Sequence, residues 1–360
     1  MLKWYKMLTI LIAGHTMKLL SFLSLFILPC LVFANDGFGA LDAGGIIIGK
    51  TDDIAMQKEV LDISYDKIKV DYEFVNESDK DITETIVFPL PPYYVGDPNP
   101  AYIGTIPDFK VVVNGQPVKF KTKVRAVTDD ENRTETDITQ KLRGMGFSDY
   151  DIVMAAYNIK KILQDKADIL KKNGLLDQDF VYTGGWDIES LWKNYVTYEW
   201  KQTFKAHQKL KVSHTYTPLP SSGMSACYIN TLLGGDLQSS REGLAKYLCA
   251  DAKTLDKLDN LAKNDRNWQG YPCLRGADIS YILRTANTWK DGIRDFHLIL
   301  RSKTPDETVS SCFSKSIKQT SPTTYEVKLK NFKPKKDLSV YFGNIDKNAP
   351  FTEAKPPVFQ

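Results

Sequence analysis

The stretch KIKVDYEFVN, residues 67–76, decides the fold class, because apolar and polar side chains alternate along it. Such alternation puts apolar side chains on one face of a β-strand and polar ones on the other, so that one face is buried and the other meets water. Residues 45–125 continue this character in β-branched and aromatic runs separated by turn residues, namely IIIGK, IAMQKEVLDIS, ITETIVFPL, FKVVVNG and QPVKFKTKV. The sequence predicts a mainly β protein of the α+β class, with an antiparallel β-sandwich and helical insertions.

The dipeptide Asn114-Gly115 is the strongest turn signal of this region. It separates two short apolar runs in KVVVNGQPVKF, residues 110–120. Both residue types tolerate the positive φ angles of a two-residue turn, so we expect a β-hairpin here.

A helical period replaces the alternation after Ser148. Apolar residues recur every three or four positions, at Ile152, Ala156, Ile159, Leu163, Ala167 and Leu170. Ser148 is the expected N-cap, and Asn173-Gly174 supplies a stop. The pattern predicts one continuous amphipathic helix that lies against the sandwich, within an insertion of about residues 136–192.

Residues 195–218 return to alternation around a polar turn, and we expect a hairpin that resumes the sheet. A second, disulfide-stapled β-rich region is predicted to begin near residue 221. Its expected helices are 241–249 and 252–263, and its expected strands are 279–286, 295–302, 323–332 and 338–344. The predicted domains are 35–220 and 221–347, followed by a loose tail at 348–360.

The stretch MKLLSFLSLFILPCLVFA, residues 17–34, has the layout of a secretory signal peptide, with a lysine, an apolar run and a Val-Phe-Ala ending. We expect residues 1–34 to be removed by cleavage between Ala34 and Asn35, with Met17 as an alternative start of translation. The apolar run is shorter than the roughly 20 residues of a membrane span, so no permanent transmembrane segment is predicted. The mature protein is expected to be periplasmic or secreted.

Four cysteines remain after the leader: Cys227, Cys249, Cys273 and Cys312. An even number in an oxidising compartment favours two disulfides, and all three pairings stay open. The leader holds three of the 47 Lys and Arg and none of the 44 Asp and Glu, which leaves 44 basic against 44 acidic residues. A chain without net charge or a basic cluster does not favour a nucleic-acid partner.

The segment GGIIIGKT, residues 44–51, matches the phosphate-loop pattern G-x-x-x-x-G-K-[ST]. A phosphate loop opens a helix, whereas the isoleucine run is strand-like and the residues after it look extended. We interpret the match as coincidence, and neither a nucleotide nor another cofactor is predicted.

The sequence carries no catalytic signature, because the patterns G-x-S-x-G and H-E-x-x-H are both absent. His207 and His214 could face each other across the expected hairpin, but no third ligand is indicated nearby, and no metal site is predicted. Closely spaced carboxylates keep a hydrolase of envelope glycans as an alternative, at Asp52-Asp53, Asp129-Asp130-Glu131 and Asp149/Asp151.

Aromatic residues crowd into residues 180–204, and about half of them should point into the core. Trp186 and Trp192 stand outside the expected strand, so they are predicted to be exposed and to form a contact surface for a glycan or a protein.

Four stretches carry a family resemblance: NDGFGALDAGGIIIGKTDDIAMQKEVLDIS after the leader, VFPLPP at 87–92, YEWKQTF at 198–204, and RDFHLILRS with SSCFSK near the C-terminus. They resemble a family of secreted bacterial domains, the domain of unknown function numbered 4424. This resemblance implies a secreted protein and no particular activity. Residues 45–218 are also similar to the vault and inter-alpha-trypsin (VIT) domain, through VFPLP, FKVVVNGQPV, a helical excursion and a strand pair ending in HTYTP. That similarity implies a β-rich interaction module.

The leader, the β pattern and the missing catalytic motifs together predict an extracytoplasmic, non-enzymatic protein that binds an envelope protein or a glycan. Besides the hydrolase, a self-assembling surface or structural subunit stays open, since residues 35–43 could donate a strand to a sheet edge.

Overall fold

The computed structural model describes residues 42–44, 51–96, 104–129, 134–176, 178, 191–219, 226–227, 241–264, 275–313, 316–346 and 359. The predicted leader, its cleavage site at Ala34 and Asn35, and nearly all of the tail after residue 346 lie outside these residues. Residues Gly39–Gln360 form one compact unit.

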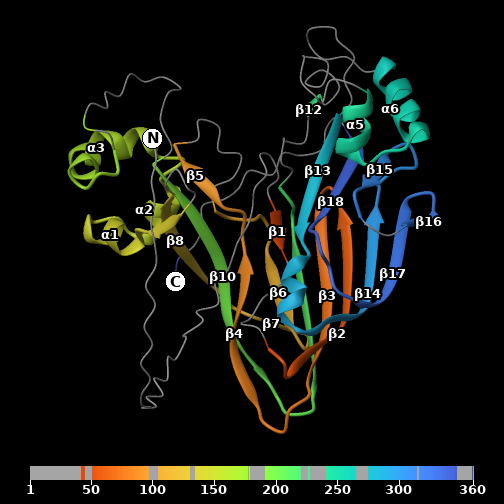
Figure 1. The fold of residues 1–360 in the computed structure, drawn as a ribbon, viewed down its shortest axis with the longest axis horizontal. Coiled ribbons are helices and arrows are strands. Elements are labelled where there is room, and N and C mark those ends of the chain that lie inside the picture. Colours follow the sequence, from red (N-terminus) through yellow and green to blue (C-terminus); the bar gives the residue numbers. More distant parts are fainter. Residues whose placement is uncertain are drawn as a thin grey trace, which may run out of the picture. The chain divides into compact units, whose positions relative to one another are not determined.

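The described strands form three β-sheets (Figure 1). The large sheet has eight strands in the order β16-β17-β14-β2-β3-β11-β6-β7. These strands are β2 Ile54–Ser64, β3 Lys67–Asn76, β6 Lys110–Val113, β7 Gln116–Pro117, β11 Lys209–Tyr216, β14 Lys290–Arg301, β16 Lys318–Ser321 and β17 Thr324–Phe332.

The other two sheets have five strands each. The insertion sheet has the order β4-β10-β8-β9, and β5 also pairs with β10. Its strands are β4 Ile82–Pro89, β5 Tyr93–Val95, β8 Lys121–Asp129, β9 Glu135–Asp137 and β10 Trp192–Phe204. The C-terminal sheet has the order β1-β13-β18-β15, and β12 also pairs with β13. Its strands are β1 Asp42–Gly44, β12 Ala226–Cys227, β13 Arg275–Ile282, β15 Thr308–Ser311 and β18 Leu338–Gly343.

The predicted β-rich α+β class is confirmed, and β2 and β3 begin and end where the sequence pattern places them. Two strand pairs of the described sheets are parallel rather than antiparallel, β14 with β2 and β1 with β13. Because β14 lies beside β2, the expected boundary near residue 221 does not separate the described strands. Alternation of apolar and polar residues predicts that a strand has a buried face, but it does not predict which strand pairs with it.

The hairpin predicted at Asn114-Gly115 is confirmed as the turn between β6 and β7. The φ angle is 47° at Asn114 and 83° at Gly115. A turn with two positive φ angles has the twist that joins neighbouring antiparallel strands, and asparagine and glycine adopt it at low cost.

The prediction of a hairpin at residues 195–218 is wrong. Both strands exist, but β10 and β11 do not pair with each other. β10 pairs with β4 in the insertion sheet, while β11 pairs with β3 in the large sheet. The two strand pairs turn a corner together, where the amide of Asn76 donates to the carbonyl oxygen of Phe204 at 2.9 Å and the backbone N–H of His207 donates to that of Asn76 at 3.0 Å. The long-range partner Asn76 therefore directs the chain from one sheet to the other.

The prediction of a single helix after Ser148 is also wrong. The segment forms two helices, α2 Asp149–Met154 and α3 Ile159–Lys172. The hydroxyl of Tyr93 donates to the carbonyl oxygen of Val153 at 2.7 Å, and the amide of Asn194 donates to that of Ile152 at 2.8 Å. In an unbroken helix these carbonyls would accept hydrogen bonds from the next turn. Side chains of β5 and β10 thus end α2 at a point that the apolar period does not mark.

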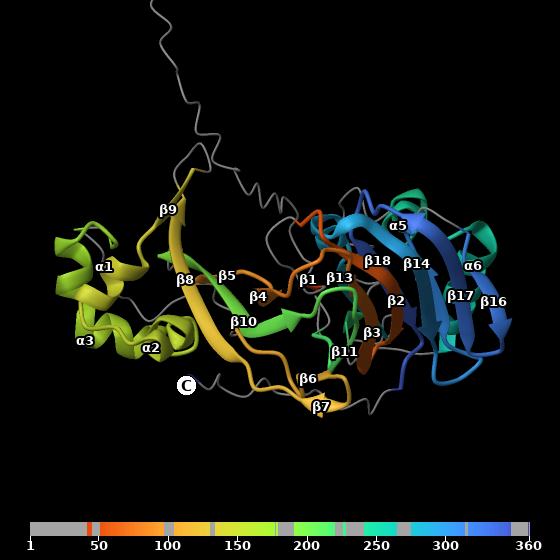
Figure 2. The ribbon, with the colours of Figure 1, turned by 90° about the horizontal axis from the view of Figure 1, so that it is seen from below.

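The insertion also contains α1 Thr139–Gly144, and the three helices gather near β8 and β10 (Figure 2). Their apolar side chains, including Leu142, Ile152, Leu163 and Leu170, are part of the main core. Core packing of the amphipathic stripe is therefore confirmed. Among the described helices, none is both long and apolar enough to cross a bilayer.

Ser148 caps α2 as predicted. Its hydroxyl accepts a hydrogen bond from the backbone N–H of Asp151 at 3.1 Å, and the carboxylate of Asp151 accepts one from the backbone N–H of Ser148 at 2.9 Å. We expect Ser148→Ala to lower the free energy of unfolding by about 1 kcal/mol, because the backbone N–H of Asp151 then loses its acceptor. Urea unfolding would measure the change, and an unaltered midpoint and slope would contradict the role of the cap.

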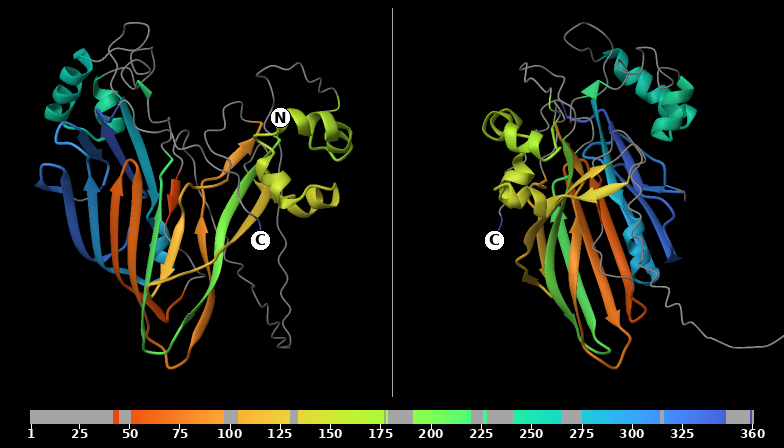
Figure 3. Two further views of the ribbon diagram at one scale, coloured as in Figure 1. Left: turned by 180° about the vertical axis from the view of Figure 1, so that it is seen from behind. Right: turned by 60° about the vertical axis from the view of Figure 1, so that its left-hand side comes forward.

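Helices α5 Arg241–Leu248 and α6 Ala252–Asn264 confirm the predicted helical patches (Figure 3). They share a small core with Tyr341 of β18, formed by Leu244, Leu248, Leu255, Leu258 and Ala262. A disulfide joins Cys249, just after α5, to Cys312, just after β15. Cys273 lies outside the described residues, and the side chain of Cys227 is not described.

Candidate functional site

The predicted contact surface at Trp192 is wrong, because this side chain is only 1% exposed. β10 begins at Trp192, three residues earlier than expected, so Trp192 shares the inward face of the strand with Tyr198 and Trp200. Its indole N–H donates to the side-chain oxygen of Asn194 at 3.1 Å. Trp186 lies outside the described residues.

His207 and His214 do not face each other. His207 is exposed at the corner after β10 and lies 2.8 Å from Asp79, whereas His214 is buried on β11. The described residues contain no group of three His, Cys, Asp or Glu side chains that could hold a metal ion.

The phosphate-loop match falls mostly on residues 45–50, which are not described. The segment that follows is a strand, since β2 begins at Ile54. The hydroxyl oxygen of Thr51 accepts hydrogen bonds from the backbone N–H groups of Asp53 and Ile54, at 3.1 and 3.3 Å. This arrangement differs from the helix start that a phosphate loop needs.

Two of the carboxylates considered for hydrolysis stabilise local structure. Asp149 pairs with Arg143 at 2.7 Å, and Asp151 completes the capping box of α2. Asp130 and Glu131 lie outside the described residues. Asp129 belongs to a different arrangement, which is the candidate site.

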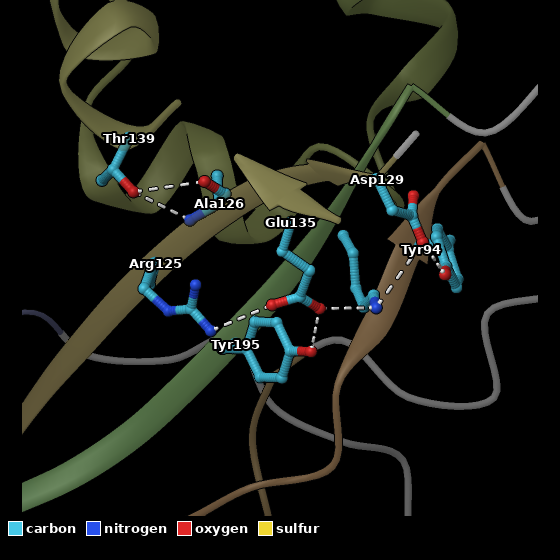
Figure 4. Close-up of polar contacts among 8 residues, drawn as sticks. Tyr94, Arg125, Ala126, Asp129, Glu135, Thr139 and Tyr195 are labelled. Atoms are coloured by element: carbon cyan, nitrogen blue, oxygen red, sulfur yellow. Dashed lines mark hydrogen bonds and ion pairs between the residues drawn. The ribbon is translucent and has the colours of Figure 1, made fainter. Parts of the chain in front are cut away.

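The candidate site is a cluster of rings and charges on the insertion sheet (Figure 4). We call it the tyrosine-lysine cluster; it comprises Tyr94, Arg125, Asp129, Glu135, Lys193 and Tyr195. The residues come from β5, β8, β9 and β10, which pair side by side. Strand register brings them together, since Tyr195 pairs with Arg125, and Lys193 pairs with Tyr94.

Lys193 is held by two carboxylates and two rings. Its ammonium nitrogen lies 2.8 Å from Glu135 and 3.7 Å from Asp129. The same nitrogen is 5.3 Å from the ring centroid of Tyr94 and 5.5 Å from that of Tyr195, within the range of cation–π attraction. The hydroxyl of Tyr94 donates to Asp129 at 2.8 Å, and that of Tyr195 donates to Glu135.

Glu135 and Lys193 keep their charges at neutral pH. Partial burial alone would raise the pKa of Glu135, but its bonds with Lys193 and Tyr195 outweigh burial and hold this pKa below the usual value. Burial likewise opposes the charge of Lys193, yet Glu135 and the neighbouring tyrosines raise its pKa. A general acid or base works best with a pKa near the working pH, so this pair is suited to holding charges rather than to moving protons.

Exposed tyrosines lie on elements that adjoin the tyrosine-lysine cluster, but not on one face of the insertion sheet. Tyr93 and Asn194 face α2, so Tyr94, Lys193 and Tyr195 point to the opposite face. Among the described residues the exposed large hydrophobic side chains are all tyrosines, with exposed fractions of 36% at Tyr94, 43% at Tyr150, 69% at Tyr157 and 43% at Tyr247. Tyr94 belongs to β5, while Tyr150 lies on α2 and Tyr157 in the turn after it. The bond from Tyr93 to Val153 fastens β5 to α2. Three of the four exposed tyrosines therefore belong to joined elements, and Tyr247 lies apart on α5.

These residues were missed in the sequence because their signals are weak. β5 and β9 have three residues each, too short for alternation to show, and Glu135 sits in a polar stretch without a period. A pair of tyrosines in YYV, residues 93–95, offers the one local sign, since the first tyrosine is buried and the second exposed.

Comparison with known proteins gives a family and distant structural neighbours. No curated protein matches the chain. A candidate nutrient binding protein from Legionella pneumophila is 16% identical, with a TM-score of 0.43, over 84% of this chain and 71% of that one. An M1 zinc metallopeptidase from Deinococcus radiodurans is 8% identical, with a TM-score of 0.24, over 82% of this chain and 43% of that one.

The family assignment comes from the sequence itself. The model of the family described as a domain of unknown function, DUF4424, matches residues 34–341. This match covers the three sheets, the helical insertion and every residue of the tyrosine-lysine cluster. The chain belongs to the DUF4424 family.

Proposed function

We propose that the protein is an extracytoplasmic, non-enzymatic binding protein that engages a protein of the cell envelope through the helical end of its insertion sheet. The observation that carries this proposal is the exposure of Tyr150 and Tyr157 on α2 and the turn after it, with Tyr94 exposed on the adjoining strand β5. Tyrosine offers a large apolar surface with a polar tip and loses little conformational entropy on binding. It is enriched with arginine at protein–protein interfaces for these reasons.

The tyrosine-lysine cluster lies on the face of the sheet opposite to α2, and a partner that reaches around the end of the sheet meets charges that are already arranged. Lys193 and Arg125 are both paired with Glu135, and the side chain of Lys193 is only 16% exposed. A partner that docks beside these residues does not have to order them first, and this lowers the entropy cost of association.

The covered face of the Tyr195 ring favours a protein partner over a glycan. The guanidinium carbon of Arg125 lies 4.4 Å from the centroid of this ring. A sugar stacks on an open ring face, and the cation already covers one face of Tyr195. The ring edges and ion pairs of the tyrosine-lysine cluster instead match the mixed apolar and polar surface of a folded protein.

The extracytoplasmic location rests on the predicted signal peptide, and the Cys249–Cys312 disulfide supports it. Disulfides persist in oxidising compartments and are rare in the reducing cytosol.

The proposal is tested by recovering binding partners from cell envelopes with the tagged mature protein. We expect the double variant Tyr150→Ala/Tyr157→Ala to recover at least about tenfold less of a stoichiometric protein partner than the unaltered protein, because interface tyrosines often contribute more than 1 kcal/mol each. Quantitative mass spectrometry after crosslinking gives the readout.

Tyr247→Ala is the matched control, since Tyr247 is as exposed as Tyr150 but lies on α5. This variant should recover the partner normally, and thermal unfolding of each variant checks that the fold is retained. Equal recovery by all variants would contradict the proposed surface. Shortened glycans released by the unaltered protein would favour the hydrolase instead.

A further inference from the structure

We propose that protonated Glu59 holds the large sheet and the C-terminal sheet together. Separation of the two sheets then releases a proton and is favoured in alkaline solution. This device is separate from the partner surface, which lies on the insertion sheet.

Glu59 lies in the core between the two sheets. It is on the inward face of β2 and is 2% exposed. Its carboxyl oxygen is 3.5 Å from the hydroxyl of Tyr281, which belongs to β13 of the C-terminal sheet. The hydroxyl of Tyr281 also lies 2.8 Å from that of Tyr72 on β3. Three polar groups from two sheets thus meet at one point of the core.

No cation compensates this carboxyl among the described residues, where neither a lysine nor an arginine forms an ion pair with Glu59. The titratable groups that face the cluster are Tyr72 from β3, Tyr281 from β13, and Tyr216 from β11, which acts on Tyr281 electrostatically. On β14, the residue paired with Glu59 is Phe296, which does not titrate.

His214 of β11 is a group near this cluster that could become a cation, since its ring centroid lies 5.5 Å from that of Tyr72. It is 1% exposed, neither ring nitrogen has a hydrogen-bond partner among the described residues, and burial lowers its pKa to about 3. His214 is therefore neutral wherever Glu59 titrates. An ionised Glu59 would face hydroxyl groups and rings only.

Burial accordingly raises the pKa of Glu59 from 4.5 to about 8, and the hydrogen bond from Tyr281 offsets only part of this rise. The closed protein thus holds the proton more tightly than an open form in which water reaches the carboxyl. The sign follows from linkage: the closed form is favoured fully below pH 4.5, and its advantage falls as the pH rises toward 8. Well above pH 8 both forms are ionised and the equilibrium becomes independent of pH.

Tyr281 keeps its proton throughout, because burial raises its pKa well above 10. Opening therefore means that β13 moves away from β2 and β3, while the contact of the insertion sheet with β11, made by Phe88 and His214, stays in place.

Hydrogen exchange followed by mass spectrometry tests the device on the intact mature protein between pH 5.5 and 9, with intrinsic exchange rates removed. We expect amides of β13 to exchange roughly 100-fold faster at pH 8 than at pH 5.5, with only about a twofold further rise at pH 9. Amides of β8 and β10 should change much less. In Glu59→Gln, which keeps the shape without the titration, β13 should show no such dependence.

Glu84→Gln is the matched control, because Glu84 is exposed on β4 and should leave the pH dependence unaltered. If Glu59→Gln does not fold, Tyr281→Phe serves instead: it removes the donor and should make β13 exchange faster at every pH. An equal pH dependence in the unaltered protein and Glu59→Gln would overturn the proposal. A uniform acceleration in all three sheets would also overturn it, since it would show global unfolding.

Discussion

Replacing both Cys249 and Cys312 by serine is expected to lower the free energy of unfolding by about 4 kcal/mol. The two cysteines are 63 residues apart in the sequence, and a crosslink over such a loop removes much of the entropy of the unfolded chain. The bond also matters locally, since α5 and α6 are packed on β18 by a small core of six buried side chains. Urea unfolding of the double variant and the unaltered protein, both without reductant, measures this loss.

The remaining attachments of α5 give the prediction its control. The hydroxyl of Ser310 donates to the carbonyl oxygen of Leu248 at 2.5 Å, and that of Tyr247 donates to Asp278 at 2.9 Å. Ser310→Ala should therefore cost far less than the double serine variant, about 1 kcal/mol. A loss below about 1 kcal/mol in the double serine variant would show that packing alone holds the helices and would contradict the stapling role.

Gly276→Ala is expected to lower the free energy of unfolding by about 3 kcal/mol, because the added methyl group would overlap the ring of Tyr341. A Cβ atom on Gly276 would lie 2.5 Å from Cε2, 2.6 Å from Oη and 2.8 Å from Cζ of that tyrosine. Gly276 pairs with Gly343, whose Cβ would lie 2.8 Å from the other edge of the same ring. Tyr341 thus lies over two paired glycines, is 2% exposed, and has little room to move.

Gly144→Ala is the matched control for this prediction. Gly144 ends α1, and a Cβ atom there would meet nothing within 4 Å. Alanine favours the helix and restricts the unfolded chain, so we expect a gain of about 0.5 kcal/mol. Thermal unfolding of both variants separates the effects. If Gly276→Ala unfolds at the same temperature as the unaltered protein, the packing of Tyr341 on these glycines is not a constraint.

The parts of the fold that could be predicted are those with a local cause. Strands β2 and β3, the turn at Asn114-Gly115 and helix α6 each carry their own period or turn chemistry. Residues close in sequence decide these features, so a single chain is sufficient to find them.

The parts that could not be predicted depend on distant residues. The carbonyls that end α2 are bound by Tyr93 and Asn194, which lie 60 and 42 residues away in the chain. The placement of β14 beside β2 likewise depends on packing between segments far apart. Neither effect leaves a mark in the hydrophobic pattern.

The candidate site shows the same limit. Trp192 is predicted to be exposed because it precedes the expected strand, but β10 begins at this residue and turns its side chain inward. Tyr94 and Lys193 meet only because β5 pairs with β10, and Glu135 joins them through β9. A site assembled by strand register cannot be recognised before the register is known.

Site-specific photo-crosslinking in intact cells tests the central claim most directly, because it asks which face of the protein meets a partner in its own compartment. A photoreactive phenylalanine would replace Tyr157 in one variant and Tyr247 in the other. We predict a discrete crosslinked band containing one envelope protein from position 157, and none from position 247. Crosslinks of equal yield from both positions, or none from position 157, would contradict a binding surface at the helical end of the insertion sheet.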